Sequence, residues 1–250
     1  MPKDVRPGHR RLAASLARVR RSRVRKKRLV WSANLVYAIG LVATDGCLLG
    51  TGRHVAFVSK DLALIRAFLR GVDRVGARIR KARRAYRVYF GDVELYDWLT
   101  AVGLTPRKSL TMRGLRVAPE FFLDAVRGLL DGDGSIAHYV HTPNLADYPN
   151  YRYRRLCVRF YSASEAHLSW LQTQLGATLG IRGALIRQPR ELRHDLFALQ
   201  YAKHASIALL TRLYEDPKTP RLRRKWLIWE DYRSRPIETR PYRRRQRLPT

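Results

Sequence analysis

Apolar residues recur at a helical spacing in two well-separated segments, Ala38–Gly46 and Val126–Gly134. Each segment contains an internal glycine and ends in the pair Asp-Gly. The apolar stripes are formed by Leu35, Ile39, Val42, Phe122, Val126 and Leu129. Matched segments of this kind are typical of a chain that is built from two related halves. The pattern therefore predicts two corresponding helices, one in each half.

Gly40 and Gly128 lie in the middle of these segments. A glycine inside a helix costs about 1 kcal/mol relative to alanine, and this cost is understandable where two backbones must approach closely. We therefore expect the two helices to pack against each other, with Gly40 near Gly128. The glycines that close the segments, Gly46 and Gly134, are expected in the left-handed conformation just past a helix end.

The aspartates near the ends of the two segments, Asp45 and Asp133, are the first candidates for chemistry. A carboxylate at a helix C-terminus is disfavoured by about 0.3–1 kcal/mol, and two carboxylates brought together would also repel each other. A shared divalent cation, Mg²⁺ or Mn²⁺, removes this conflict, and such sites are common in phosphoryl chemistry. The alternative is a pair of ordinary, solvated Asp-Gly helix ends.

The rest of each half alternates between strand and helix patterns. After the first helix, the expected elements are a strand Val55–Ser59, a helix Asp61–Leu69, strands near Ala77–Lys81 and Tyr86–Phe90, and a helix from Asp92. After the second helix, they are strands Ile136–His141 and Leu156–Ser162, a helix Ser164–Leu179, strands Ala184–Gln188 and Leu196–Tyr201, and a helix from Ala205. The order helix–strand–strand–helix–strand–strand–helix in duplicate predicts an α+β fold with antiparallel sheets, although the first half shows one strand fewer.

Basic residues are concentrated at both ends of the chain, outside the two halves. We expect a basic N-terminal arm over residues 1–30 and a basic tail over residues 236–250. The first lobe should cover residues 31–115, with a linker from about residue 104, and the second lobe should cover residues 116–235.

The overall charge narrows the class of partner. The formal net charge is +30, with 50 Lys and Arg against 20 Asp and Glu, and an excess of this size favours nucleic acid. No apolar run is long enough to cross a bilayer, and we expect no membrane partner. The two cysteines, Cys47 and Cys157, lack the spacing of zinc ligands, which fits an intracellular, reducing compartment such as cytoplasm or nucleoid, with organelle or nucleus left open.

One expected strand shows which face would meet a nucleic acid. In residues 155–161, Leu156, Val158 and Phe160 share one side, and arginines alternate with them on the other. Arginine on a strand that enters a major groove pairs in a two-pronged way with guanine. The DNA-binding candidates selected by this pattern are Arg78, Arg80, Arg87, Tyr89, Arg155, Arg159, Tyr161 and Arg187. The alternative is an ordinary solvated sheet face.

Taken together, the two segments resemble the motifs of the LAGLIDADG homing endonucleases in their single-chain, two-motif form. Gly128–Gly134 stands where that family reads G-L-I-D-A-D-G, whereas Ala43 and Thr44 depart from it in the first copy. The resemblance implies two pseudo-symmetric αββαββα lobes that pack through their motif helices, with antiparallel sheets forming a DNA-binding saddle. It also implies a monomeric, site-specific double-strand DNA endonuclease that acts on a long, asymmetric target, with metal held by Asp45 and Asp133.

The resemblance also assigns a supporting catalytic role to Lys203. This residue falls between the strand Leu196–Tyr201 and the next helix, where the family keeps a basic residue near the scissile phosphates. The corresponding position of the first half is Asp92, so only the second half would supply a basic residue to the reaction. A solvated surface lysine is the alternative for Lys203. Asp131 has no acidic counterpart in the first motif and is expected to have a structural or secondary role.

Two other functions remain open at the level of the sequence. An intron RNA-splicing maturase on the same scaffold would use the basic faces and tails on folded RNA. A cleavage-inactive DNA-binding regulator is the second, although retention of both Asp45 and Asp133 argues against it. Among nucleases, an intron-encoded or free-standing homing enzyme fits this chain better than an intein.

Overall fold

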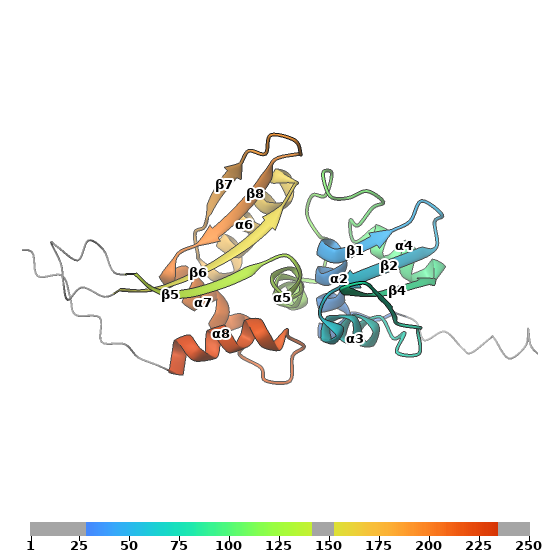
Figure 1. Cartoon of the computed structure of the whole chain (residues 1–250), viewed down its shortest axis with the longest axis horizontal. Coiled ribbons are helices and arrows are strands. Elements are labelled where there is room, and N and C mark those ends of the chain that lie inside the picture. Colours follow the sequence, from blue (N-terminus) through green and yellow to red (C-terminus); the bar gives the residue numbers. More distant parts are fainter. Residues whose placement is uncertain (1–28, 142–152, 235–250) are drawn as a thin grey trace, which may run out of the picture. The chain divides into compact units, whose positions relative to one another are not determined.

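The computed structural model describes residues 29–141 and 153–234, and the fold lies in the unit that begins at Trp31 (Figure 1). The expected basic tail and all but the last two residues of the expected basic arm lie outside the described residues. Among the described residues, no helix is both long enough and apolar enough to cross a membrane.

Two helices form the centre of the fold, α2 (Ala33–Asp45) and α5 (Phe122–Gly132). They lie side by side in Figure 1 and pack directly on each other. A Cβ atom on Gly40 would lie 2.3 Å from the Ala125 carbonyl oxygen, and one on Gly128 would lie 2.3 Å from that of Tyr37. Only glycine permits this approach. The expected contact between the two motif helices is therefore confirmed.

The first half contains a four-stranded antiparallel sheet in the order β1-β2-β4-β3. Its strands are β1 (Gly46–Leu48), β2 (His54–Ser59), β3 (Arg80–Ala82) and β4 (Ala85–Gly91). Its helices are α3 (Leu62–Gly71) and α4 (Val93–Ala101). Strand β1 is the strand that the sequence pattern did not show, because three residues are too few to reveal an alternation.

The second half repeats this sheet in the order β5-β6-β8-β7. Its strands are β5 (Ser135–His141), β6 (Tyr153–Ser162), β7 (Ala184–Gln188) and β8 (Leu196–Tyr201). Its helices are α6 (Glu165–Leu179) and α7 (Lys203–Leu213). The α+β class and the duplicated two-lobe architecture are therefore confirmed.

Helices cover one face of each sheet. In the first half, the ring of Phe57 on β2 lies 4.8 Å from that of Phe68 on α3, and in the second half α6 and α7 lie against β6 and β8 (Figure 1). Leu156, Val158 and Phe160 on β6 are at most 2% exposed. Burial of these side chains fixes which face of each strand turns inward, so the alternate residues are placed on the opposite face.

One helix, α8 (Arg223–Ser234), was not expected from the sequence. It packs along β5, with the Arg154 guanidinium 4.5 Å from the centroid of the Tyr232 ring. Its many charged residues, four of them among the first eight, hide the apolar pattern of a packed helix. A short 3₁₀ turn, η1 (Pro119–Phe121), precedes α5.

The glycines after the two aspartates differ from the expectation. Gly46 has φ −89° and ψ 160°, which is extended backbone, and Gly134 also lacks a positive φ. A Cβ atom on Gly46 would lie 2.6 Å from the Val42 Cα atom, and one on Gly134 would lie 2.7 Å from the Leu130 carbonyl oxygen. The left-handed prediction was therefore wrong: these positions need glycine because the chain folds tightly back against the helix end.

Candidate functional site

Asp45 and Asp133 stand at the ends of the two crossing helices. Asp45 is the last residue of α2 and Asp133 is the residue that follows α5. Each aspartate is as far along the chain from its crossing glycine, Gly40 or Gly128, as the other. Because the helices are in contact at those glycines, the two carboxylates emerge near each other, one from each lobe.

The surroundings of the two carboxylates favour their neutral forms. Burial and, to a smaller extent, the negative charge of Asp133 raise the pKa of Asp45 to about 6. Burial also raises the pKa of Asp133. The positive charges of Lys225 and Lys108 act in the opposite direction on both pKa values. The site is thus an anionic pair that is incompletely compensated by two lysines.

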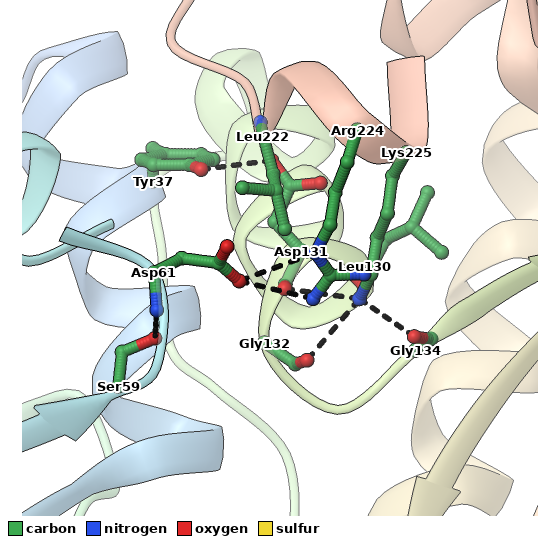
Figure 2. A network of polar contacts seen from close by, with 10 residues as sticks. All are labelled: Tyr37, Ser59, Asp61, Leu130, Asp131, Gly132, Gly134, Leu222, Arg224 and Lys225. Atoms are coloured by element: carbon green, nitrogen blue, oxygen red, sulfur yellow. Dashed lines mark hydrogen bonds and ion pairs between the residues drawn. The ribbon is translucent and has the colours of Figure 1, made fainter. Parts of the chain in front are cut away.

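Lys225 holds the end of the second motif helix. Its Nζ atom donates to the carbonyl oxygens of Gly134 at 2.6 Å and of Gly132 at 3.2 Å (Figure 2). It also donates to those of Leu130 at 2.6 Å and Asp131 at 3.0 Å. Burial lowers the pKa of Lys225 to about 8. This ammonium group therefore closes the turn that presents Asp133.

Lys108 occupies the corresponding place in the first lobe. Its Nζ atom donates to the carbonyl oxygen of Gly46 at 2.6 Å, and Gly46 follows Asp45 as Gly134 follows Asp133. Lys108 is 6% exposed and Lys225 is 4% exposed, and burial lowers the pKa of Lys108 as well. The two lysines are thus a pseudo-symmetric pair beside the two aspartates.

The sequence analysis assigned no role to either lysine, although the sequence contains a signal for them. The tripeptide Thr-Pro-Arg occurs at residues 105–107 and again at residues 219–221. Lys108 follows the first copy directly, and Lys225 follows the second after three residues. In a chain with 50 Lys and Arg, a repeated short phrase is more informative than charge itself.

Asp131 is completely buried and anchors the segment that leads into α8. Its Oδ2 atom accepts hydrogen bonds from the Tyr37 hydroxyl at 2.8 Å and from the Leu222 amide at 2.7 Å (Figure 2). Two residues further on, Arg224 bonds to Asp61 of the first lobe at 3.1 Å. These contacts fit the structural role that was expected for Asp131, and they connect both lobes through one short segment.

Lys203 does not join the two aspartates. It begins α7, and its Nζ atom lies 4.7 Å from the centroid of the Tyr153 ring. Tyr153 pairs with His141, whereas Asp133 precedes the opposite end of the same strand, β5. At about 3.4 Å per residue, the length of β5 separates the two ends by roughly 20 Å. The structure therefore does not support the catalytic role expected for Lys203.

Asp92, the first-lobe counterpart of Lys203, is also explained by the fold. It is 3% exposed, caps α4 by accepting from the Leu95 amide at 3.2 Å, and pairs with Arg74. A capped helix start with a paired carboxylate is a structural arrangement.

The four DNA-binding candidates of the first lobe come together. Arg78, Arg80, Arg87 and Tyr89 line one depression of about 210 Å³ on the sheet face that turns away from the helices. Arg80 lies directly opposite Arg87 in the β3–β4 ladder, and the Arg87 guanidinium lies 5.7 Å from the centroid of the Tyr89 ring. The result is a cationic, aromatic surface.

The second-lobe candidates are more dispersed. Arg159 and Tyr161 share the open face of β6, and the Arg159 Nε atom donates to the Gln200 Oε1 atom at 2.6 Å. Arg155 is exposed beside Tyr153, with its guanidinium 5.9 Å from the ring centroid.

Arg187 belongs to the other face of the same sheet. Arg187 lies opposite Phe197 in the β7–β8 ladder, and Phe197 lies opposite Ser162 in the β6–β8 ladder. The side chains of these three residues therefore lie on the same face of the sheet as the buried Phe160. Its Nε atom donates to the Asp195 Oδ2 atom at 2.6 Å. The register therefore separates Arg187 from the other candidates, because successive residues of a strand alternate between faces.

The donor set fits a magnesium-type ion only in part. Among the residues that the structure describes, no cluster of three or more His, Cys, Asp or Glu side chains could hold a metal by itself. Mg²⁺, however, is usually bound by one or two carboxylates together with substrate phosphates and water. Asp45 is half-buried and Asp133 is exposed, and this pair, whose charges repel each other, fits this incomplete type of site.

Comparisons with known proteins agree with this architecture. No family model matches the chain, and no curated protein matches it by sequence. Structures of mesophilic variants of the homing endonuclease I-DmoI and of I-DmoI with DNA and Ca each match with 16% identity and a TM-score of 0.53. Each match covers 79% of this chain and 97% of that chain. The LAGLIDADG homing endonuclease I-LtrWI bound to target DNA matches with 9% identity and a TM-score of 0.54, over 81% of this chain and 89% of that chain.

These likenesses concern the fold. The chain has a LAGLIDADG-like fold with two lobes that meet at their motif helices, as the resemblance of the two Asp-Gly segments predicted.

Proposed function

We propose that this protein is a site-specific double-strand DNA endonuclease that depends on a divalent metal ion, Mg²⁺ or Mn²⁺. The observation that carries the proposal is the convergence of Asp45 and Asp133, one from each lobe, at the ends of helices that touch through Gly40 and Gly128. Burial and the charge of Asp133, which together raise the pKa of Asp45, make the ionised pair unfavourable for the fold alone. Retention of such a pair is understandable if a cation and a phosphate complete it.

Asp45 and Asp133 would hold the metal together with the DNA backbone. When bound, the ion supplies positive charge to the phosphate that is being hydrolysed and to the oxygen that leaves. A cavity of about 70 Å³ lies beside Asp133, also lined by Thr44 and Ser109, and it has room for water close to the carboxylate.

Lys108 and Lys225 would act on the reaction without holding the metal. The Lys108 ammonium group bonds to the carbonyl group after Asp45, and the Lys225 ammonium group bonds to the carbonyl groups on both sides of Asp133, so both carboxylates are positioned before DNA arrives. They also place fixed positive charge next to the site, where negative charge develops in a phosphoryl transition state. Because each lobe supplies one aspartate and one lysine, a single chain contains a complete site.

The open faces of the two sheets would bind the duplex. The first-lobe depression around Arg80 and Arg87 and the second-lobe residues Arg159 and Tyr161 lie on these faces. Since the faces differ in sequence, the target is expected to be long and asymmetric. The net charge of +30 favours binding through phosphates, which makes the affinity strongly dependent on salt.

Replacement of Asp133 by asparagine tests the proposal. Asp133→Asn removes one charge but keeps the size of the side chain, so DNA binding should persist while double-strand cleavage falls by at least about 1000-fold. Cleavage is measured on duplexes selected from a randomised library with Mg²⁺, and binding is measured on the same duplexes. Full cleavage by this variant would contradict the proposal.

The matched control is Asp195→Asn, which removes an aspartate from the β7–β8 hairpin without touching the site. This variant should cleave normally. Activity of the unchanged protein in an intron-splicing assay, without any DNA cleavage, would instead support a maturase, and specific DNA binding with no cleavage under any metal would support a regulator.

A further inference from the structure

The outer strand pairs of the two sheets occupy the same place in the fold but carry different side chains. In the strand order, β3 and β4 form the outer pair of the first sheet, and β7 and β8 form that of the second. Both pairs have one face turned away from the helices. A difference between these faces is therefore a difference between two equivalent parts of the proposed DNA surface.

The first-lobe pair is cationic, and the fold does not explain its charge. Arg80 and Arg87 are both exposed and face each other across the ladder. Within the described residues, neither has a carboxylate partner among the ion pairs. Like charges directly opposite each other destabilise a sheet. An anionic ligand that passes over this face would remove the cost, and the adjoining Arg78 and Tyr89 enlarge the same depression.

The second-lobe pair is apolar and neutral at the equivalent place. The rows of its open face are Ala184 opposite Gln200, Ile186 opposite Ala198 and Gln188 opposite Leu196, and the first two rows are the counterparts of the arginine-bearing rows of the first lobe. Ile186 is 39% exposed, so an apolar side chain faces solvent on this strand. The arginine of β7, Arg187, belongs to the other face and is paired with Asp195. This outer surface therefore presents apolar side chains and amide groups, and it carries little charge.

These two surfaces match different base pairs in a major groove. Arginine forms a two-pronged contact with guanine O6 and N7, glutamine does the same with adenine, and apolar side chains contact the thymine methyl group. Gln200 accepts from Arg159 through one oxygen lone pair and keeps its second lone pair and its amide donors. Its orientation is thereby fixed by Arg159, which favours one type of base.

We propose that the two lobes read half-sites of opposite composition: the first lobe reads guanines through Arg80 and Arg87, and the second reads A·T pairs through Gln200 and Ile186. This inference rests on the proposed function, because it assumes that the open faces bind duplex DNA. It goes further in assigning the class of sequence that each lobe selects. The target would accordingly be G·C-rich on one side of the cleavage point and A·T-rich on the other.

The experiment uses the full chain with Asp133→Asn, so that DNA is bound without being cut, and a randomised duplex library as the probe. The selected sequences should show guanine preference in one half-site and A·T preference in the other. Adding Arg80→Ala and Arg87→Ala should abolish the guanine preference and lower affinity for the selected duplex roughly 10- to 100-fold. The preference in the other half-site should not change.

Two further variants separate base reading from charge and test the second lobe. Arg80→Lys with Arg87→Lys keeps both charges but loses the planar fork, so it should retain affinity for random DNA and lose most of the guanine preference. Ile186→Ala should relax the thymine preference in the opposite half-site only. All these side chains are exposed, and unchanged melting temperatures would verify that the variants fold.

Two results would overturn the inference while leaving the endonuclease intact. The first is a guanine preference that survives the double alanine replacement, and the second is an effect of Ile186→Ala in the same half-site as that of the arginines. Absence of any duplex binding would overturn the proposed function and this inference together.

Discussion

The two lobes share one architecture, but the lysines next to Asp45 and Asp133 make different numbers of hydrogen bonds. In the first lobe, Lys108 makes one hydrogen bond to the carbonyl group after Asp45. In the second, Lys225 bonds to four carbonyl groups around Asp133, and the helix that carries it, α8, has no described counterpart at the end of the first lobe. Both lobes thus contain one aspartate and one lysine at the site, whereas the number of hydrogen bonds that the lysine makes differs between them.

Symmetry is preserved most closely where packing leaves no alternative. The glycine approach distances at the helix crossing are equal for Gly40 and Gly128, at 2.3 Å to a carbonyl oxygen of the opposite helix. The divergent features, α8 and the outer strand pairs, lie away from this crossing. The comparison indicates that the crossing sets the position of both aspartates, while α8 adds hydrogen bonds to the backbone around one of them.

Replacement of the two lysines should give the largest difference between the lobes. Lys225→Met leaves four carbonyl groups without their partner and should lower the free energy of unfolding by about 4 kcal/mol. Lys108→Met removes one bond and should lower it by about 2 kcal/mol. Urea unfolding at neutral pH measures both values.

The matched control for these variants is Lys203→Met, which removes a lysine of the second lobe that lies over Tyr153. Its effect on unfolding should stay below about 1 kcal/mol. Equal losses for Lys108→Met and Lys225→Met would show that α8 adds no support to the second lobe.

The glycine crossing should respond equally from both sides. A Cβ atom on either Gly40 or Gly128 would overlap a backbone carbonyl oxygen, so the helices must separate. We expect Gly40→Ala and Gly128→Ala each to cost about 3 kcal/mol of unfolding free energy, and both to reduce cleavage, because the aspartates move apart. Thermal unfolding and cleavage of a selected duplex are the measurements.

Gly50→Ala provides the control for these two variants, since nothing lies within 4 Å of its added Cβ atom and its φ is not positive. It should change stability by less than about 0.5 kcal/mol. If only one of the crossing glycines proved sensitive, the symmetry of the helix pair would be refuted.

Most of the fold was accessible from periodicity, because long amphipathic elements bury a regular face. The strands Ala184–Gln188 and Leu196–Tyr201 were expected with the bounds that the structure has. The exceptions are β1, which is too short to show an alternation, and α8, whose charged residues mask its packed side. In both cases tertiary contacts decide the structure.

The sequence analysis selected the two aspartates of the candidate site but not its two lysines. Asp45 and Asp133 are recognisable because acids are rare in this chain and these two recur in matched segments. Lys108 and Lys225 are two among 50 basic residues, and apart from the repeated Thr-Pro-Arg tripeptide before them only their contacts with carbonyl groups distinguish them. Lys203 was chosen because the resemblance implies a basic residue at its position between two elements, and that position does not determine the direction of a long side chain.

The smallest expected effect concerns the charge of Asp45 and depends on pH. Burial and the charge of Asp133 raise the pKa of Asp45 to about 6, above the value near 4 of an unfolded chain. The folded protein therefore binds this proton more tightly than the unfolded chain does. The charge of Asp45 destabilises the folded protein increasingly as the pH rises from about 4 to about 6, and the full penalty applies above that range.

Asp45→Asn should raise the melting temperature of the metal-free protein by about 3 °C at pH 7.5, and it should leave the melting temperature unchanged at pH 4. The same scan with Mg²⁺ and selected duplex should reverse the order at pH 7.5, because only the unchanged protein keeps both carboxylates for the ion. A variant that melts earlier than the unchanged protein at pH 7.5 without metal would show that the aspartate charge is compensated within the fold, and the two lobes would then no longer share a site that needs an added cation.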